Sequence, residues 1–133
     1  MLAGCGGMMG SSDAIRDSVD DAIHEDAVHL AASRTITTLP SMMDETDRHT
    51  TRMIGIMGDM RTDMTSMQHC ADFESMMDLR DGMRVELDSH ATTMHAIDDV
   101  GAARREVELH VATMNMMLGD MGSMLDSTHC GGW

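Results

Sequence analysis

The chain has 133 residues, enough for one domain with a single core, and its 9 Lys+Arg against 23 Asp+Glu give a formal net charge of −14. A chain this acidic has no basic patch to displace counterions from phosphates, which excludes nucleic acid as an expected partner. The charge suits cation binding, or solvation in a salty habitat. The apolar residues include 19 Met but one Phe, one Trp and no Tyr, so the composition favours helices over strands and predicts an all-α protein.

The first ten residues (1–10) are rich in glycine and are expected to form a flexible tether. Within them, Leu2-Ala3-Gly4-Cys5 resembles the end of a lipobox, the sequence at which bacterial lipoprotein precursors are cleaved and lipidated. The resemblance implies that Cys5 carries a lipid anchor, which would require a full signal peptide upstream, and that the domain of residues 11–130 is held in the periplasm or at the cell surface. No segment approaches the ~20 apolar residues of a membrane span, so the expected link to a membrane is this lipid.

Four helices are expected in the remaining residues. Capping oxygens in Ser11-Ser12-Asp13 precede apolar residues at helical spacing, which predicts a first helix that ends near Arg34. Pro40 suits the first turn of a second helix, which extends to about Gln68. A turn at residues 69–71 and a break at residues 98–101 bound the third helix, so two helical hairpins span about residues 11–68 and 72–129. Their short connections predict an up-down-up-down four-helix bundle.

Two cysteines provide a test of that topology. Cys70 follows the second helix and Cys130 follows the fourth, so an up-down-up-down bundle brings both to the same end. In an oxidising compartment we expect a disulfide between them. Two free thiols, or a small metal site that includes the preceding His69 and His129, are the alternatives.

One short pattern, Glu-x-x-x-His, occurs four times and uses four of the six glutamates, as Glu25/His29, Glu45/His49, Glu86/His90 and Glu106/His110. A shift of the chain against itself by 61 residues superposes the first two occurrences on the last two without a gap. This internal repeat predicts that the bundle is a duplicated helical hairpin. The spacing places each Glu and His about one turn apart on one helix face, where both can bind an ion or the carboxylate can orient the imidazole.

Antiparallel pairing decides which of these eight residues meet. If the first connection centres near residue 37, each Glu lies level with the His of the neighbouring helix, in the pairs Glu25/His49, Glu45/His29, Glu86/His110 and Glu106/His90. Two layers of two Glu and two His then stand about 6 Å apart, close to the spacing of dinuclear metal sites. We therefore predict that the eight residues are ligands of two transition-metal ions. Half of these ligands are imidazoles, which favours Cu or Zn.

The ligand pattern resembles that of the ferritin-like di-iron and di-manganese bundles, which use a Glu from each of two helices and a Glu-x-x-His from each of the other two. The matching residues are Glu25, Glu86, Glu45/His49 and Glu106/His110. The resemblance implies Fe or Mn and a possible oxidoreductase. However, the spacing here is Glu-x-x-x-His, and the turn at residues 69–71 is too short for the long crossover of ferritins, so iron-oxidase activity is not carried over.

Methionine adds a second indication of the metal. Met53, Met94 and Met114 each follow a histidine of the pattern by four residues, and thioether ligands would favour Cu(I), although most of the 19 Met are expected in the core. A hydrogen-bonded polar core without metal, and haem held by two facing histidines, are the alternatives. We expect a protein that stores, buffers or delivers metal rather than an enzyme, because eight ligands around two ions leave few open positions. His24 and His95 lie outside the repeat and are expected at the surface.

Overall fold

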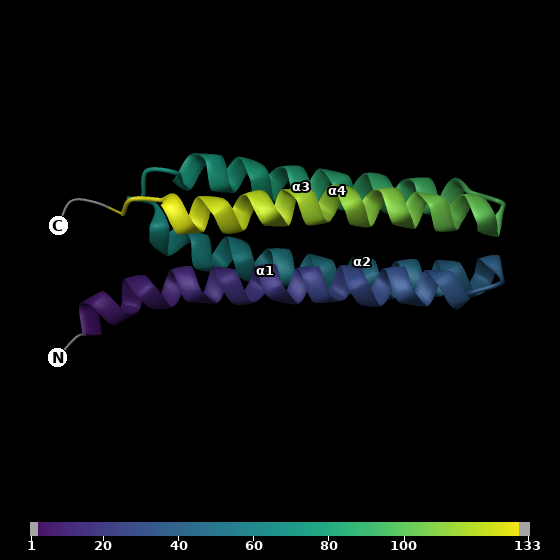
Figure 1. The fold of residues 1–133 in the computed structure, drawn as a ribbon, viewed down its shortest axis with the longest axis horizontal. Helices are drawn as coiled ribbons and strands as arrows, with labels where there is room; N and C mark the ends of the chain where they lie inside the picture. Colours follow the sequence, from purple (N-terminus) through teal and green to yellow (C-terminus); the bar gives the residue numbers. More distant parts are fainter. Residues whose placement is uncertain (1–2, 131–133) are drawn as a thin grey trace.

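A computed structural model describes the backbone of residues 3–130 and the side chains of residues 12–130. Its elements are α1 (Ala3–Thr35), α2 (Leu39–Met64), the short 3-10 helix η1 (Thr65–Met67), α3 (Phe73–Ala96) and α4 (Val100–Ser127). The four long helices lie side by side along one axis, and each runs antiparallel to the next, so that both chain ends are at one end of the bundle (Figure 1). The predicted all-α, up-down-up-down four-helix bundle is confirmed. Each helix packs against two neighbours, which leaves α1 and α3, and α2 and α4, across the diagonals.

The sequence explains where α2 and α4 begin. The Thr38 hydroxyl accepts a hydrogen bond from the Ser41 amide at the start of α2, where Pro40 occupies the first turn. The Asp99 carboxylate accepts a hydrogen bond from the Ala102 amide at the start of α4. Side chains therefore satisfy amides that the first turn of each helix leaves unpaired.

The start of α1 differs from the expectation. The helix begins at Ala3 and runs through the capping oxygens at residues 11–13, so residues 3–10, predicted as a tether, are helical in the structure. No proline interrupts this segment, so backbone hydrogen bonding can continue towards the N-terminus despite its glycines. The side chain of Cys5, the predicted lipidation site, lies outside the described residues. At the other end of the first hairpin, α2 stops at Met64 and η1 covers the last turn of the predicted helix.

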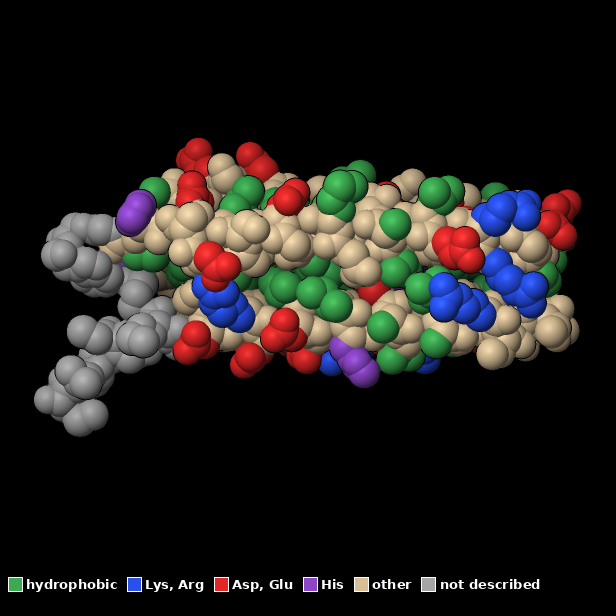
Figure 2. Space-filling model, viewed as in Figure 1, with side chains coloured by type: hydrophobic (Ala, Val, Ile, Leu, Met, Phe, Trp, Pro, Cys, Tyr) green, Lys and Arg blue, Asp and Glu red, His purple; other side chains and the backbone are tan. Residues whose placement is uncertain are grey.

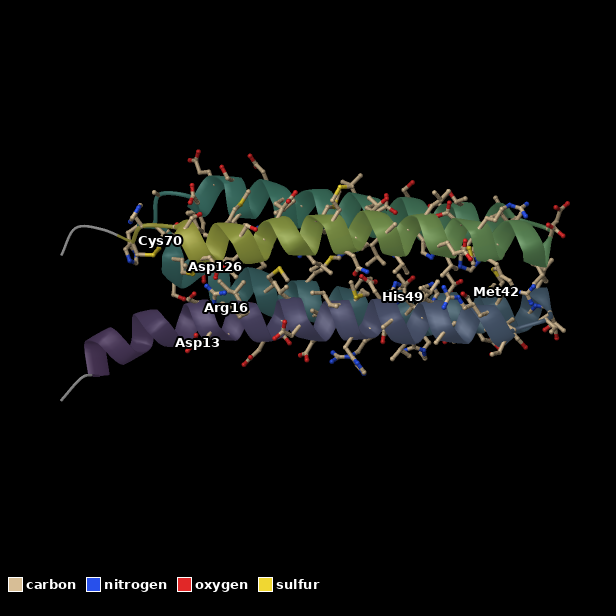
Figure 3. The ribbon with its side chains drawn as sticks, in the orientation of Figure 1. Asp13, Arg16, Met42, His49, Cys70 and Asp126 are labelled. Atoms are coloured by element: carbon tan, nitrogen blue, oxygen red, sulfur yellow. A yellow bond between two sulfur atoms is a disulfide. The ribbon has the colours of Figure 1, made fainter. Side chains whose placement is uncertain are left out.

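Methionine dominates a core that is divided into two apolar clusters. The larger cluster lies toward the chain ends and contains Met53, Met57, Met60, Met83 and Met114 among its buried residues. The smaller lies toward the α1–α2 connection and contains Met42 and Met94 with Ala103, Val107 and Val111. Along α2, α3 and α4 the buried histidines fall between residues of the two clusters, and His49 lies inside the bundle in Figure 3. The polar layer is therefore enclosed by apolar side chains on both sides.

A disulfide joins the two hairpins at the end of the bundle that holds the termini. Cys70 and Cys130 are bonded, as predicted, and lie at that end of the bundle (Figure 3). The Ala71 amide also donates to the His129 carbonyl oxygen at 2.7 Å. The two sulfurs lie close to His69, but because they are bonded to each other they offer no thiolate to a metal. The alternative of a metal site at this end is therefore not supported.

Acidic side chains are spread along the face in Figure 2, while most basic ones gather toward the end remote from the termini. Among the described residues, no helix combines the length and the apolar character that crossing a bilayer requires. Among residues 12–130, three large apolar side chains are more than 60% exposed, and all belong to the second hairpin: Val85, Leu109 and Met116.

Candidate metal centre

Four histidines, one from each long helix, meet inside the bundle. This histidine cluster consists of His29, His49, His90 and His110, and none of the four residues is more than 1% exposed. The rings of His29 and His49 are stacked with centroids 3.8 Å apart, and those of His90 and His110 are stacked at the same distance. The two stacks meet edge to face across the bundle.

The inner ring nitrogens of the cluster are paired across the diagonals. The Nε2 atoms of His29 and His90 lie 3.3 Å apart, and those of His49 and His110 lie 3.2 Å apart. Both contacts join residues that are 61 positions apart, which is the period of the sequence repeat. Equivalent residues of the two hairpins thus face each other, as a pseudo-twofold axis through the bundle requires.

The outer ring nitrogens contact the four glutamates of the repeat. Each Nδ1 lies 2.7 or 2.8 Å from a carboxylate oxygen, in the pairs His49/Glu25, His29/Glu45, His110/Glu86 and His90/Glu106. These are the four pairs that the repeat and the antiparallel alignment predicted. The carboxylates therefore lie outside the imidazoles, in the position from which a second-layer group orients a metal-bound histidine. A direct ligand role for the four glutamates remains a prediction.

The carboxylates of the first hairpin fix the tautomers of its histidines. Burial alone would raise the pKa of Glu25, but hydrogen bonds from His49 and Arg48 outweigh it and lower this pKa to about 2. Burial would likewise raise the pKa of Glu45, but hydrogen bonds from Arg48 and His29 outweigh this effect and lower it. An ionised carboxylate can only accept, so Nδ1 of His29 and His49 carries a proton and donates it. When these rings are neutral, each Nε2 presents a lone pair to the facing histidine.

Burial favours the neutral form of three imidazoles in the cluster, those of His29, His90 and His110. It lowers the pKa of His29 to about 4, with a contribution from neighbouring His49, and it lowers the pKa of His90 as well. For His110, burial and the three other histidines lower the pKa to about 2. Two neutral rings whose Nε2 lone pairs face each other at 3.2–3.3 Å repel, unless a cation or a proton lies between them.

One acid that the repeat does not contain lies directly against the cluster. Asp26 is 0% exposed, and neither of its carboxylate oxygens has a hydrogen-bond partner among the described residues. Its Oδ1 lies 3.9 Å from Nε2 of His49, and Asp26, His49 and His110 each offer a ligand atom within 4.8 Å of the others. Burial and the nearby charge of Glu25 raise the pKa of Asp26 to about 8. These three residues could together hold a metal ion.

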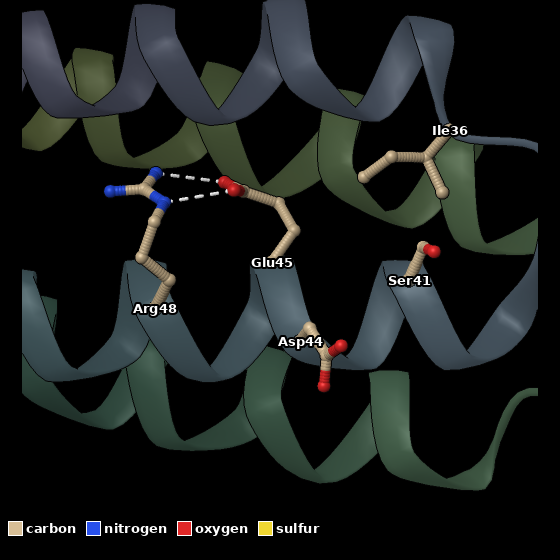
Figure 4. Close-up of a pocket in the computed structure, with 5 residues that line it drawn as sticks. All are labelled: Ile36, Ser41, Asp44, Glu45 and Arg48. Carbon is tan, nitrogen blue, oxygen red and sulfur yellow. Dashed lines mark hydrogen bonds and ion pairs between the residues drawn. The ribbon is translucent and has the colours of Figure 1, made fainter.

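The two hairpins differ in how they cover the cluster. In the first, Arg48 donates two hydrogen bonds to Glu25 (3.0 and 2.8 Å) and two to Glu45 (both 2.8 Å). The side chains of this α1/α2 carboxylate pair are only 7% and 10% exposed. A surface groove of about 320 Å³, lined by Ile36, Ser41, Asp44, Glu45 and Arg48, has this ion pair at one end (Figure 4).

In the second hairpin, Leu109 occupies the position equivalent to Arg48 and is 66% exposed. The α3/α4 carboxylate pair, Glu86 and Glu106, is 25% and 21% exposed, and within the described chain its ion pairs are with His110 and His90 alone. Burial and the neighbouring charge of Glu106 raise the pKa of Glu86. One carboxylate pair thus shares a guanidinium, and the other has no basic partner among the described residues.

The remaining predicted residues fall outside these contacts. Met53 and Met114 are buried in the larger apolar cluster and Met94 in the smaller one, so their role as ligands remains a prediction. His24 is exposed, and His95 is a surface residue that bonds Asp47.

Two candidate functional residues were missed from the sequence. Asp26 precedes His29 by three residues, which puts both on one face of α1, and Arg48 follows Glu45 at a spacing that favours an ion pair. Both signals were present, but neither residue recurs 61 positions later, where Leu87 and Leu109 stand.

Comparisons of the chain with protein-family models, curated proteins and solved structures gave no match.

Proposed function

We propose that this bundle binds transition-metal ions through Nε2 of the four core histidines, with Asp26 as a further ligand and the four glutamates as the groups that orient the imidazoles. The observation that carries the proposal is the buried, unpartnered carboxylate of Asp26 beside two converging Nε2 atoms. Burial without a hydrogen bond disfavours the ionised form of this group and raises its pKa to about 8, and a bound cation would displace the proton and stabilise the carboxylate.

The spacing of the inner nitrogens suits one ion on each diagonal. Two nitrogens 3.2–3.3 Å apart, each about 2.0–2.1 Å from a shared ion, subtend an angle of about 100–110°, close to the tetrahedral value. The ring stacks separate the two diagonals by 3.8 Å, which is within the spacing of dinuclear sites. The pair His49/His110, which has Asp26 as a third ligand, would bind the first ion more tightly than His29/His90 binds the second.

The same distances disfavour haem. An iron with an imidazole on each face separates the two Nε2 atoms by about 4 Å, twice the length of a metal–imidazole bond. The observed separations are shorter, and the second histidine pair is stacked where a porphyrin would have to lie.

A donor set of imidazole nitrogens and one carboxylate suits Zn²⁺ and Cu²⁺, and we propose copper where thioethers of Met53 or Met114 join the site. The ligands lie between two apolar clusters in the core of the bundle, which supports storage, buffering or delivery of the ion. The disulfide between Cys70 and Cys130 suits an oxidising location such as the periplasm or cell surface, where a lipid on Cys5 would hold the domain.

Calorimetric titration of the metal-free protein with Cu²⁺, Zn²⁺, Fe²⁺ and Mn²⁺ tests the proposal. We expect Cu²⁺ or Zn²⁺ to bind with a dissociation constant below micromolar and a stoichiometry near two. Because only the folded chain presents the site, ligand at 100 times the dissociation constant should add about 2.7 kcal/mol of stability and raise the melting temperature.

The matched variants are two double substitutions. His49→Ala/His110→Ala should abolish the tighter ion and most of the rise in melting temperature, whereas His24→Ala/His95→Ala changes two histidines outside the cluster and should change neither. If the first double variant does not fold, Asp26→Asn provides the same test with the histidines intact. If none of the four ions binds more tightly than micromolar and melting is indifferent to a chelator, the cluster is a polar core and the proposal is wrong.

A further inference from the structure

The two faces of the histidine cluster offer a cation different routes to the same ligands. On each face, a carboxylate near the surface contacts Nδ1 of a histidine. The Nε2 atom of the same ring lies inside the bundle, so each face has a path of contacts that leads inward from solvent. On the α1/α2 face the path begins at Arg48, and on the α3/α4 face it begins at Glu86 and Glu106 themselves.

Charge distinguishes the two routes. The four hydrogen bonds from Arg48 occupy the oxygens of Glu25 and Glu45, and its guanidinium repels an approaching cation. A cation in the groove on this face would therefore meet the positive charge of Arg48 at one end (Figure 4). On the opposite face, Glu86 and Glu106 are more exposed and lack a basic partner in the described part of the chain.

The unneutralised carboxylates can also release the histidines behind them. A cation on Glu86 or Glu106 takes oxygen lone pairs that otherwise accept the Nδ1–H of His110 or His90, both at 2.8 Å. Weakening that bond frees the ring to turn, so that the ion can reach the inner nitrogens and the unpartnered carboxylate of Asp26.

We propose that Glu86 and Glu106 are the surface site at which a divalent transition-metal ion is captured and released, and that Arg48 seals the opposite face. This inference rests on the proposed metal binding. It assigns the α3/α4 carboxylate pair a role in the rate of exchange, which is separate from the affinity of the ligands inside.

Leu109→Arg tests the proposal, because it places on the α3/α4 face the residue that covers the α1/α2 face, at a position exposed enough to leave the fold intact. The measurements are the stopped-flow rate of uptake of Zn²⁺ or Cu²⁺, whichever binds in calorimetry, and the rate of its removal by a chelator. Both rates should fall about tenfold or more, as for the loss of a steering charge, while the dissociation constant changes little.

Met116→Arg is the matched control. Met116 is 67% exposed, and it lies on the same helix face as Leu109, about 10 Å further along α4. Its replacement adds the same charge without covering the carboxylate pair, so the exchange rates should stay near those of the wild type. Arg48→Leu should accelerate exchange, at most doubling it, since it adds a second route similar to the first.

The outcomes separate this inference from the proposed function. A wild-type protein that binds none of the ions overturns both. Tight binding with exchange rates that Leu109→Arg leaves unchanged, or that Met116→Arg lowers equally, overturns only the assignment of the α3/α4 pair. A large acceleration in Arg48→Leu with no effect of Leu109→Arg would place the route on the α1/α2 face instead.

Discussion

Replacing Asp26 by Leu should stabilise the metal-free protein at neutral pH. Folding raises the pKa of this carboxyl group from 3.8 to about 8, because burial and the charge of Glu25 disfavour its ionised form. The unfolded chain therefore releases the proton at a lower pH than the folded chain does. Each pH unit between those two values subtracts about 1.4 kcal/mol from the free energy of unfolding, or about 4 kcal/mol at pH 7.

Leu is a suitable replacement because the second hairpin has Leu87, which is 0% exposed, at the equivalent position. Any difference in packing is independent of pH, so the decisive quantity is the change in the stability gain with pH. Urea unfolding of metal-free wild type and Asp26→Leu should show that this gain falls by about 3–4 kcal/mol between pH 7 and pH 4. Asp26→Asn, which keeps the shape and removes the charge, should follow the same trend.

The histidines act in the opposite direction and should become visible in the variant. Folding lowers the pKa of His29 from 6.5 to about 4 and that of His110 to about 2, so only the unfolded chain takes up their protons as the pH falls below 6.5. Together they remove about 4 kcal/mol between pH 7 and pH 5. In the wild type the protonation of Asp26 offsets most of this loss, so the variant should be the more acid-sensitive protein. A stability gain that is equal at pH 7 and pH 4 would refute the reasoning, as would metal affinity that is unchanged in Asp26→Asn.

Three other perturbations have expected outcomes. Replacing Cys70 and Cys130 by Ser should lower the free energy of unfolding by about 4 kcal/mol, because the bond closes a loop with a sequence separation of 60; calorimetric melting that is equal with and without the bond would contradict this. Met53→Leu and Met114→Leu should each lower the free energy of unfolding by less than about 1.5 kcal/mol, since Leu and Met have similar volumes. A loss of Cu(I) affinity in either variant would identify a thioether ligand, whereas unchanged affinity would leave both as core residues. Loaded protein should keep its metal at pH 6 and release it only in more acidic buffer, because burial lowers the pKa of His29 to about 4 and that of His110 to about 2, and release near pH 6 in a dialysis assay would argue against these buried histidines as ligands.

Periodicity was sufficient to predict the fold and the four Glu–His pairs. The spacing of apolar residues sets which face of each helix is buried, and a repeat of 61 residues with short connections fixes how far along the bundle each residue lies. The lateral direction of each side chain depends on how its helix is rotated against two neighbours, and spacing alone does not give it. For that reason the sequence placed the glutamates among the ligands, while the structure shows their oxygens on Nδ1 of the histidines.

The residues that distinguish the two hairpins were the hardest to predict. A search for repeated residues discards Asp26 and Arg48, because each has a leucine as its counterpart. Their interest follows from their surroundings in three dimensions: the Asp26 carboxylate has no hydrogen-bond partner among the described residues, and the Arg48 guanidinium bonds two carboxylates.

A hairpin that pairs with an identical copy of itself must carry the same residue at both positions of every symmetric contact. In a homodimer of such hairpins, an aspartate at position 26 would place two carboxyl groups beside the histidines, and an arginine at position 48 would cover both carboxylate pairs. A single chain that carries both hairpins can hold different residues at equivalent positions, as it does with Asp26 and Leu87 and with Arg48 and Leu109. The two sides of the histidine cluster can therefore differ in charge, which no homodimer of the hairpin allows.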